Sequence, residues 1–168
     1  GSTSDWETLQ HAAAVLADAR EMGGLRTEAR LLVLVGKGHN GGDALIAAQA
    51  ILRALPGARA DVIFAFGSRA LRPLAARAWR ELVQETSERT RARPRLPPAP
   101  AYDLCFDGVF GFQFRPPADA ATTDLLQRVN ALPILLRAAV DLPSAGIFQA
   151  DFTYATGCVK TPAVGDTR

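Results

Sequence analysis

Residues 31–55 read LLVLVGKGHNGGDALIAAQAILRAL, and this stretch decides the fold. A short run of Leu and Val comes first, four glycines follow within seven residues, and a long apolar-periodic segment rich in Ala, Leu and Ile completes it. The order predicts a strand, a tight loop and a helix, with backbone N–H groups of the loop placed to meet a ligand. The loop also holds His39, Asn40 and Asp43, polar residues that most phosphate-binding loops lack.

The length and composition of the chain limit the classes of protein to which it can belong. At 168 residues it is long enough for one domain with a real core, which we expect over residues 3–168 of a chain that can be a piece of a longer protein. The net charge of +2 gives no electrostatic argument for nucleic acid or a membrane surface as a partner. No apolar run approaches the ~20 residues that span a bilayer. Cys105 and Cys158 favour two buried thiols over one disulfide, so we expect a cytoplasmic protein.

Strand-like and helix-like segments alternate along the chain. Strands are expected at residues 31–35, 61–66, 102–106, 134–140 and 148–156, and helices at 5–22, 44–55, 71–86 and 118–131. The segment 88–100 reads ERTRARPRLPPAP without periodicity, which favours a solvated Pro-rich connection over a basic partner-binding segment. The alternation predicts an α/β fold, a three-layer αβα sandwich with a Rossmann-like, mostly parallel sheet.

Polar residues follow the ends of several predicted strands. Asn40 and Asp43 come after the first strand, Asp107 after the third and Asp141 after the fourth. Because ligands bind at the carboxyl ends of parallel strands, we expect these side chains to converge. Asp107 and Asp141 are candidates for acid/base catalysis, and Asn and Asp oxygens with the hydroxyl of Ser144 suit a hard cation. Structural roles stay open for single residues, such as a helix cap for Asp43 and a turn for Asn40.

An ordinary dinucleotide site is an alternative interpretation of the glycine loop. Gly36, Gly38 and Gly41 fit the pattern G-x-G-x-x-G between a strand and a helix. Two details count against it. Asp43 would occupy the place of a pyrophosphate at the helix N-terminus, and the strand at 61–66 ends without the acidic residue that binds the ribose hydroxyls. An NADP-dependent reductase is therefore the weaker reading.

Three segments, taken together and in order, resemble the motifs of a known family. They are GKGHNGGDALIAA (36–48), FDGVFGFQFRP (106–116) and AVDLPSAG (139–146). These are similar to G-x-G-N-N-G-G-D-G-L-x-x-A, D-A-L-F-G-T-G-L-x-R and D-I-P-S-G of the NAD(P)H-hydrate epimerases, also called the YjeF N-terminal domain. The closing FTYATGCVKTP (152–162) resembles the family's T-x-T-F-G-x-x-K-P ending. The resemblance covers roughly residues 6–162.

The resemblance implies a function and a set of site residues. Members of the family interconvert the R and S epimers of hydrated NADH and NADPH, commonly as homodimers, and a fused or separate ADP/ATP-dependent dehydratase completes the repair. Asn40, Asp107 and Ser144 would hold a potassium ion. Asp107 and Asp141 would carry the acid/base chemistry. The hydrated nucleotide would be bound by two loops and one aspartate: His39, Asn40, Gly41, Gly42 and Asp43; Gly111, Phe112, Gln113, Phe114, Arg115, Pro116 and Pro117; and Asp141.

The chain departs from the family motifs at four places. His39 stands where the first Asn is usual, and Ala44 replaces a Gly. Phe112-Gln113 replaces Thr-Gly, and Ala145 separates Ser144 from Gly146. These changes touch the substrate side more than the ion side. A lost or altered activity therefore stays open, as does a non-catalytic nucleotide-binding or scaffold domain of the same fold.

Overall fold

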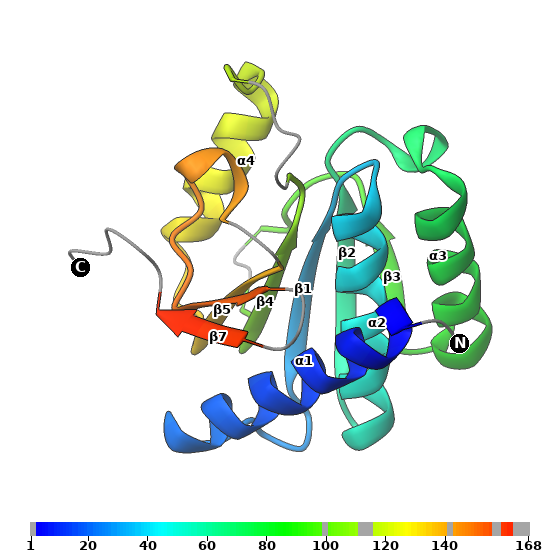
Figure 1. The fold of residues 1–168 in the computed structure, drawn as a ribbon, viewed down its shortest axis with the longest axis vertical. Coiled ribbons are helices and arrows are strands. Elements are labelled where there is room, and N and C mark those ends of the chain that lie inside the picture. The colour runs from blue at the N-terminus through cyan, green and yellow to red at the C-terminus, as the bar shows by residue number, and fades with distance from the viewer. Residues whose placement is uncertain (1–2, 99–100, 111–115, 141–142, 156–158, 163–168) are drawn as a thin grey trace.

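One twisted sheet organises the molecule (Figure 1). The computed structural model describes residues 3–98, 101–110, 116–140, 143–155 and 159–162. Seven strands follow the order β3-β2-β1-β4-β5-β6-β7; all neighbours pair in parallel except β6 and β7, which are antiparallel. The elements are α1 (Thr3–Glu21), β1 (Arg30–Val35), α2 (His39–Ala54), β2 (Arg59–Phe64), η1 (Ser68–Ala70), α3 (Pro73–Thr86), β3 (Thr90–Arg93), β4 (Leu104–Gly108), α4 (Ala120–Asn130), β5 (Leu136–Val140), η2 (Ser144–Gly146), β6 (Phe152–Ala155) and β7 (Val159–Pro162).

Both faces of the sheet are apolar, and helices pack on each. In β1, Leu31 and Val33 join a core cluster with α1, α2 and α3, whereas Leu32 and Leu34 join a second cluster with α4. This follows from the period of two along a strand, which sends successive side chains to opposite faces. A strand apolar on both faces is typical of a covered parallel sheet. The predicted three-layer αβα sandwich is confirmed.

Three differences from the prediction are larger than a shift of one or two residues at an element's end. The helix expected from residue 44 begins at His39, because the glycine segment itself is helical after Gly38. The segment 88–100 contains the short edge strand β3, whose four residues carry too little apolar pattern to predict it. The strand expected at 148–156 is shorter, and the antiparallel strand β7 follows it.

Two buried or half-buried arginines satisfy carbonyls at helix ends. Arg89 donates from Nη1 to the carbonyls of Leu52, Leu55 and Ala58, next to the end of α2. Arg137, in β5, donates from Nη2 to carbonyls at the end of α4. Carbonyls at a helix C-terminus lack partners within the helix, so a guanidinium cation there is favourable. Arg89 is thus committed to the fold.

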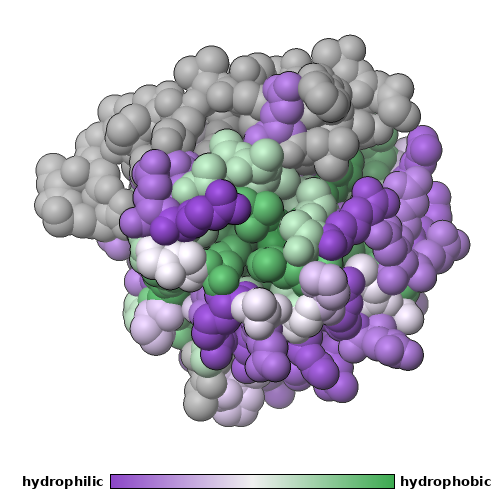
Figure 2. Space-filling view, turned by 90° about the horizontal axis from the view of Figure 1, so that it is seen from below, coloured by the Kyte–Doolittle hydropathy of each residue, from purple (hydrophilic) through white to green (hydrophobic). Residues whose placement is uncertain are grey.

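Cys105 is a free, fully buried thiol in β4, as the sequence predicts, and burial raises its pKa well above the ordinary value. Cys158 lies outside the described residues. Seen from below, hydrophobic residues gather near the middle of the surface, with hydrophilic residues on both sides of them and below (Figure 2). Within the described ranges, no helix is both long and apolar enough to cross a membrane.

Candidate active site

The order of the strands places a topological switch point between β1 and β4, and we call the carboxyl edge of these two strands the crevice. The chain leaves β1 toward α2 and β2 on one side and reaches β4 on the other, so the connections diverge at this point. In open parallel sheets, ligands bind at the carboxyl side of such a switch point. Asn40 in the first turn of α2, Asp107 in β4 and Ser144 at the start of η2 all lie on this side. The fold therefore places residues of three separate motifs at one edge.

Asp107 is the centre of the site. Its side chain is completely buried, and both carboxylate oxygens accept hydrogen bonds. Oδ1 accepts from the hydroxyl of Ser144 at 2.5 Å and from the backbone N–H of Val109 at 3.1 Å, and Oδ2 accepts from the backbone N–H of Ser144 at 2.6 Å. The carboxylate thereby fastens the segment after β5 to the end of β4.

Asn40 joins the same network through the backbone of Phe110. Its side-chain amide donates to the carbonyl of Phe110 at 2.8 Å. The N–H of Phe110 in turn donates to the hydroxyl of Ser144 at 2.9 Å. Asn40, Ser144 and Asp107 are therefore linked in one chain of hydrogen bonds. The three residues predicted to share an ion are brought together.

Burial raises the pKa of Asp107 to about 6, and the hydrogen bonds from Ser144 and Val109 oppose that rise. Desolvation disfavours the charged form of a carboxyl group, whereas donors to the carboxylate favour it. None of the ion pairs among the described residues includes Asp107. Near neutral pH the described part of the site therefore holds a buried negative charge whose hydrogen-bond donors, Ser144 and Val109, are neutral.

The residues at this edge fit a monovalent cation. Asn40 and Ser144 carry side-chain oxygens, Phe110 presents a main-chain carbonyl, and Asp107 supplies a charge without a cationic partner in the described structure. Such oxygens are the ligands that hard cations prefer. Among the described residues, no group of three or more His, Cys, Asp or Glu gathers as a metal cluster. The fit therefore rests on one carboxylate and neutral oxygens.

Close packing of glycines holds α2 against the ends of β1 and β4. A Cβ on Gly41 would lie 2.6 Å from the carbonyl oxygen of Gly36, and one on Gly36 would lie 2.0 Å from that of Val109. A Cβ on Gly108 would meet the Cβ of Ala44 at 2.7 Å and the carbonyl oxygen of Asn40 at 2.5 Å. These backbones approach too closely for side chains.

At that contact Ala44, one of the four departures, is matched by a further difference from the quoted motifs, at Gly108. The usual family motifs have Gly where this chain has Ala44, and Ala where it has Gly108. The Cβ of one residue fills the space that the other would need, so there is room for one methyl group at this contact. This chain carries it on the helix, at Ala44, whereas the quoted motifs carry it on the strand. The exchange of the small residue preserves the packing of α2 on β4, and it explains why Ala44 is accommodated.

Ala145 is a departure with a different consequence. It has φ 56° and ψ 14°, inside the left-handed region, although it is not a glycine. The family motif has Gly directly after the serine. A left-handed conformation costs an alanine roughly 1–2 kcal/mol. The segment that carries Ser144 is therefore held in a strained turn.

The other predicted residues divide into three groups. His39 is exposed at the first position of α2, and Gly41 and Gly42 are buried in its first turns. Asp43 is half-buried within α2, so its alternative role as the cap of the helix is wrong; that position is Gly38. Pro116 and Pro117 are exposed ahead of α4. The predicted residues that lie outside the described ranges are Gly111, Phe112, Gln113, Phe114, Arg115 and Asp141.

Sequence reasoning does not single out three residues at the rim of the crevice. The ammonium of Lys37 lies 4.9 Å from the centre of the Phe66 ring, and that ring lies 5.7 Å from the ring of Phe110. Each follows a different strand, β1, β2 or β4. Their position at or shortly after the ends of predicted strands was the available signal. They give the crevice a partly aromatic, positively charged rim.

The sequence matches the family described as "YjeF-related protein N-terminus" over residues 7–163. The chain belongs to this family. It is 38% identical over 118 residues to an NAD(P)H-hydrate epimerase from Bordetella pertussis (strain CS), a match covering 69% of this chain and 48% of the relative. It is 40% identical over 137 residues to the bifunctional NAD(P)H-hydrate repair enzyme Nnr of Gloeobacter violaceus, covering 81% of this chain and 25% of the relative.

The fold is similar to that of a solved structure. The crystal structure of yeast ynu0 (YNL200c) superposes with a TM-score of 0.59 at 19% sequence identity, covering 92% of this chain and 79% of that one. At this identity the likeness concerns the fold. The chain spans about half the length of the curated epimerase it matches, so the activity of that whole protein is not transferred by the match alone.

Proposed function

We propose that this protein interconverts the R and S epimers of hydrated NADH and NADPH, in the repair of nicotinamide cofactors. The observation that carries the proposal is the convergence of Asn40, Asp107 and Ser144 at the crevice between β1 and β4. These residues come from the three motifs that resemble those of the epimerases. The names of the relatives support the same activity. We infer further that residues 3–168 form one domain of this kind.

Epimerisation needs a proton donor and acceptor near the hydrated carbon of the substrate. The hydroxyl must leave and return, or the ring must open and close, and either route moves protons. A pKa of about 6 suits Asp107 to hold or release a proton near neutral pH, and Asp141 is the second candidate. Because both oxygens of Asp107 already accept hydrogen bonds, Asp107 also positions Ser144 and the main chain at Phe110.

A monovalent cation, with potassium as the expected ion, belongs to the same proposal. Asn40, Asp107 and Ser144 would hold it, and Asp107 would supply the negative charge that attracts it. When bound, the ion would neutralise that buried charge and organise the surrounding loops. The substrate would lie against the residues around His39 and those that follow Phe110.

The wider assignment has three parts. A dehydratase that uses ADP or ATP, fused to the chain or separate, would consume the product epimer. The bifunctional relative is consistent with such a partner. Homodimerisation stays a prediction of the resemblance, and a cytoplasmic location stays a prediction of the composition.

The decisive experiment mixes the protein with one pure epimer of hydrated NADPH and follows appearance of the other by NMR. Catalysed exchange supports the epimerase. Binding without exchange would favour a scaffold or nucleotide-binding domain that has lost catalysis. Hydride transfer from NADPH to a carbonyl compound would favour the reductase.

A further inference from the structure

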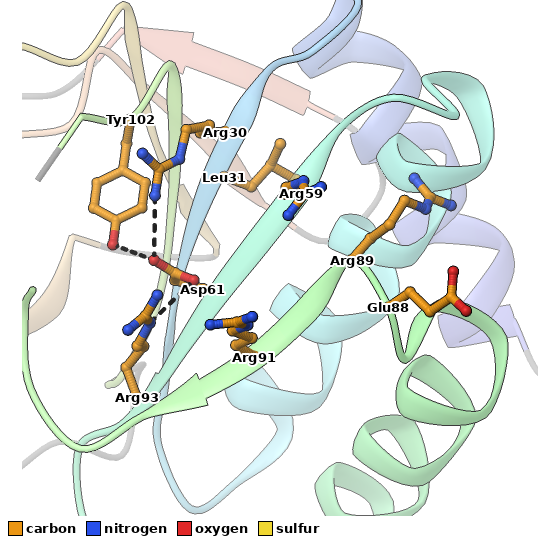
Figure 3. Close-up of a pocket in the computed structure, with 9 residues that line it drawn as sticks. All are labelled: Arg30, Leu31, Arg59, Asp61, Glu88, Arg89, Arg91, Arg93 and Tyr102. Atoms are coloured by element: carbon orange, nitrogen blue, oxygen red, sulfur yellow. Dashed lines mark hydrogen bonds and ion pairs between the residues drawn. The ribbon is translucent and has the colours of Figure 1, made fainter.

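A second site lies at the other end of the sheet, in a pocket of about 340 Å³ (Figure 3). It begins at the first residues of β1 and β2 and runs along β3, whereas the crevice is at the last residues of β1 and β4. Two carboxylates line the pocket against five arginines, which gives the lining a net formal charge of +3. The arginines are Arg30, Arg59, Arg89, Arg91 and Arg93.

The register of the strands gathers four of these arginines on one face. Arg30 is paired with Arg59, Asp61 with Arg91, and Ile63 with Arg93. Neighbours in register point to the same side of a sheet, and Ile63 belongs to the core cluster of α4. The arginines therefore project from the face opposite α2 and α3, at the end where β2 and β3 form the edge of the sheet.

One carboxylate, Asp61, forms the floor of the pocket. It is 7% exposed, and the hydroxyl of Tyr102 donates to its Oδ2 at 2.6 Å. Arg30 and Arg93 approach the same carboxylate at 3.8 Å and 3.4 Å. Figure 3 shows the three side chains pointing toward Asp61. A single negative charge is thus shared by two guanidinium groups at distances longer than a strong hydrogen bond.

The positive charge of the pocket is only partly compensated. Nε of Arg93 is buried and has no hydrogen-bond partner among the described residues; its contact with Asp61 is the ion pair at 3.4 Å. Arg59 and Arg91 are exposed, and neither takes part in an ion pair among the described residues. A cluster of like charges repels itself unless an anion joins it. The pocket is therefore built to gain stability from a negatively charged ligand.

We propose that this pocket binds a small, multiply charged phosphate anion through the guanidinium groups of Arg59, Arg91 and Arg93. The planar fork of arginine matches phosphate oxygens bidentately, which an ammonium group does not. The volume falls within the range of small-ligand pockets, with more room than a single phosphate needs. The ligand chemistry is a diphosphate group, either free or as part of a nucleotide.

A small anion fits better than nucleic acid. The whole chain has a net charge of only +2, so the positive field is local to the pocket. Tyr102, the aromatic residue of the lining, is buried, and its ring already lies 5.5 Å below the guanidinium of Arg30. Single-stranded nucleic acid binds on exposed aromatic side chains along a positive groove. This site is independent of the proposed epimerase, because it shares no residue with the crevice.

The test is titration with pyrophosphate at physiological ionic strength, by calorimetry and by NMR of backbone amides. Wild type is expected to bind, with shifts centred on β2, β3 and the start of β1. Arg59→Ala/Arg91→Ala should weaken binding by at least about tenfold, since each removes a charge-assisted contact. Arg59→Lys/Arg91→Lys keeps the charges and should give a smaller loss. The charge-matched control Arg20→Ala/Arg80→Ala removes two exposed arginines from α1 and α3 and should stay within about twofold of wild type.

The outcomes separate the sources of the ligand. Equal affinity for pyrophosphate and ADP would assign the site to the diphosphate group, and tighter binding of ADP would assign it to a nucleotide. Three results would overturn the proposal: no binding of either, amide shifts confined to the crevice, or equal weakening in the control variant. Tight binding of an RNA oligonucleotide with no response to pyrophosphate would do so as well.

Discussion

Asp107 and Asp61 are two buried aspartates on the strands that flank β1, and their surroundings differ in charge. Asp107 accepts three hydrogen bonds from neutral donors in a closely packed edge of the sheet. Asp61 lies among arginines at the floor of an open pocket, with one neutral donor, Tyr102. Among the described residues, the first arrangement leaves a negative charge without a cationic partner, and the second leaves more positive than negative charge. Each end of the sheet is thus prepared for a ligand of opposite sign.

Removing the two carboxylates is the strongest way to test this difference. Asp107→Ala leaves the buried N–H groups of Ser144 and Val109 without an acceptor, so we expect a loss of about 3 kcal/mol or more in the free energy of unfolding. Asp61→Ala leaves one buried donor, the hydroxyl of Tyr102, without its acceptor, while the guanidinium groups of Arg30 and Arg93 line an open pocket, so a smaller loss of about 1–2 kcal/mol is expected. Urea denaturation measures both. Equal losses, or a larger loss for Asp61→Ala, would contradict the comparison.

The close packing at the crevice gives the next largest effect. Gly108→Ala drives a Cβ against Ala44 and the carbonyl of Asn40, and overpacking of this kind costs about 1–3 kcal/mol. Adding Ala44→Gly restores the arrangement of the family motifs and should recover at least about 1 kcal/mol. Chemical denaturation of the two single variants and the double variant completes the cycle.

Gly42→Ala is the matched control for that cycle. It lies in the same helix, but its added Cβ would meet its nearest neighbour at 3.5 Å, an ordinary contact. Because Ala favours helix over Gly by roughly 1 kcal/mol, this variant should be as stable as wild type or more so. If the losses in free energy of unfolding of Gly108→Ala and Ala44→Gly simply add in the double variant, the two positions do not compensate each other.

The pH dependence of stability separates the two aspartates further. The folded-state pKa of Asp107 is raised to about 6 from an ordinary 3.8, so the folded protein binds more protons between these values. Stability from this group therefore falls as pH rises through that window, by roughly 1 kcal/mol between pH 5 and pH 7. Unfolding of wild type and Asp107→Asn across this range measures the difference. If the free energy of unfolding depends on pH equally in both proteins, that dependence comes from groups other than Asp107.

A bound cation should reduce the loss of stability between pH 5 and pH 7 that Asp107 causes. Potassium chloride in place of N-methylglucamine chloride, at equal ionic strength, is expected to stabilise wild type more at pH 7 than at pH 5. The cation binds the ionised form of Asp107, and acid removes that form. An equal response in Asp107→Asn would contradict the role of this carboxylate in holding the ion.

The smallest effect concerns the strained turn beside Ser144. Ala145→Gly relieves a left-handed alanine and is expected to raise the free energy of unfolding by roughly 0.5–1 kcal/mol, after the larger chain entropy of glycine is counted. Ala121→Gly, at an exposed position of α4, is the control and should lower it by about 1 kcal/mol. Thermal or urea denaturation resolves the opposite signs. A destabilised Ala145→Gly would mean that the turn is not strained.

The sheet, its layers and the crevice could be predicted from the sequence, because they follow from apolar period and strand order. The strand at residues 31–35 has no polar alternation, and polar residues stand at the ends of three strands. The start of α2 could not be predicted. Gly41 and Gly42 disfavour a helix by propensity, but tertiary packing overrides that preference: Gly41 lies tightly against the end of β1, and Gly42 faces Ala75 of α3.

The arginine pocket lies beyond what sequence reasoning reaches. Arg30, Asp61, Arg93 and Tyr102 are scattered along the chain, and only the strand register brings them together. Segment 88–100 contains Arg91 and Arg93 but lacks the apolar alternation that marks a strand, because β3 is an edge strand with exposed residues. Edge strands often carry charged side chains for this reason. The pocket follows from tertiary pairing.

The most direct test of the central claim is epimer exchange in hydrated NADPH by wild type and Asp107→Asn. The variant keeps the size of the side chain and removes its charge and its proton exchange. We expect wild type to interconvert the epimers catalytically and Asp107→Asn to lose at least about a hundredfold in rate while remaining folded. Exchange by the variant at the wild-type rate, or no exchange by wild type with potassium present, would contradict the assignment of this edge of the sheet as the active site.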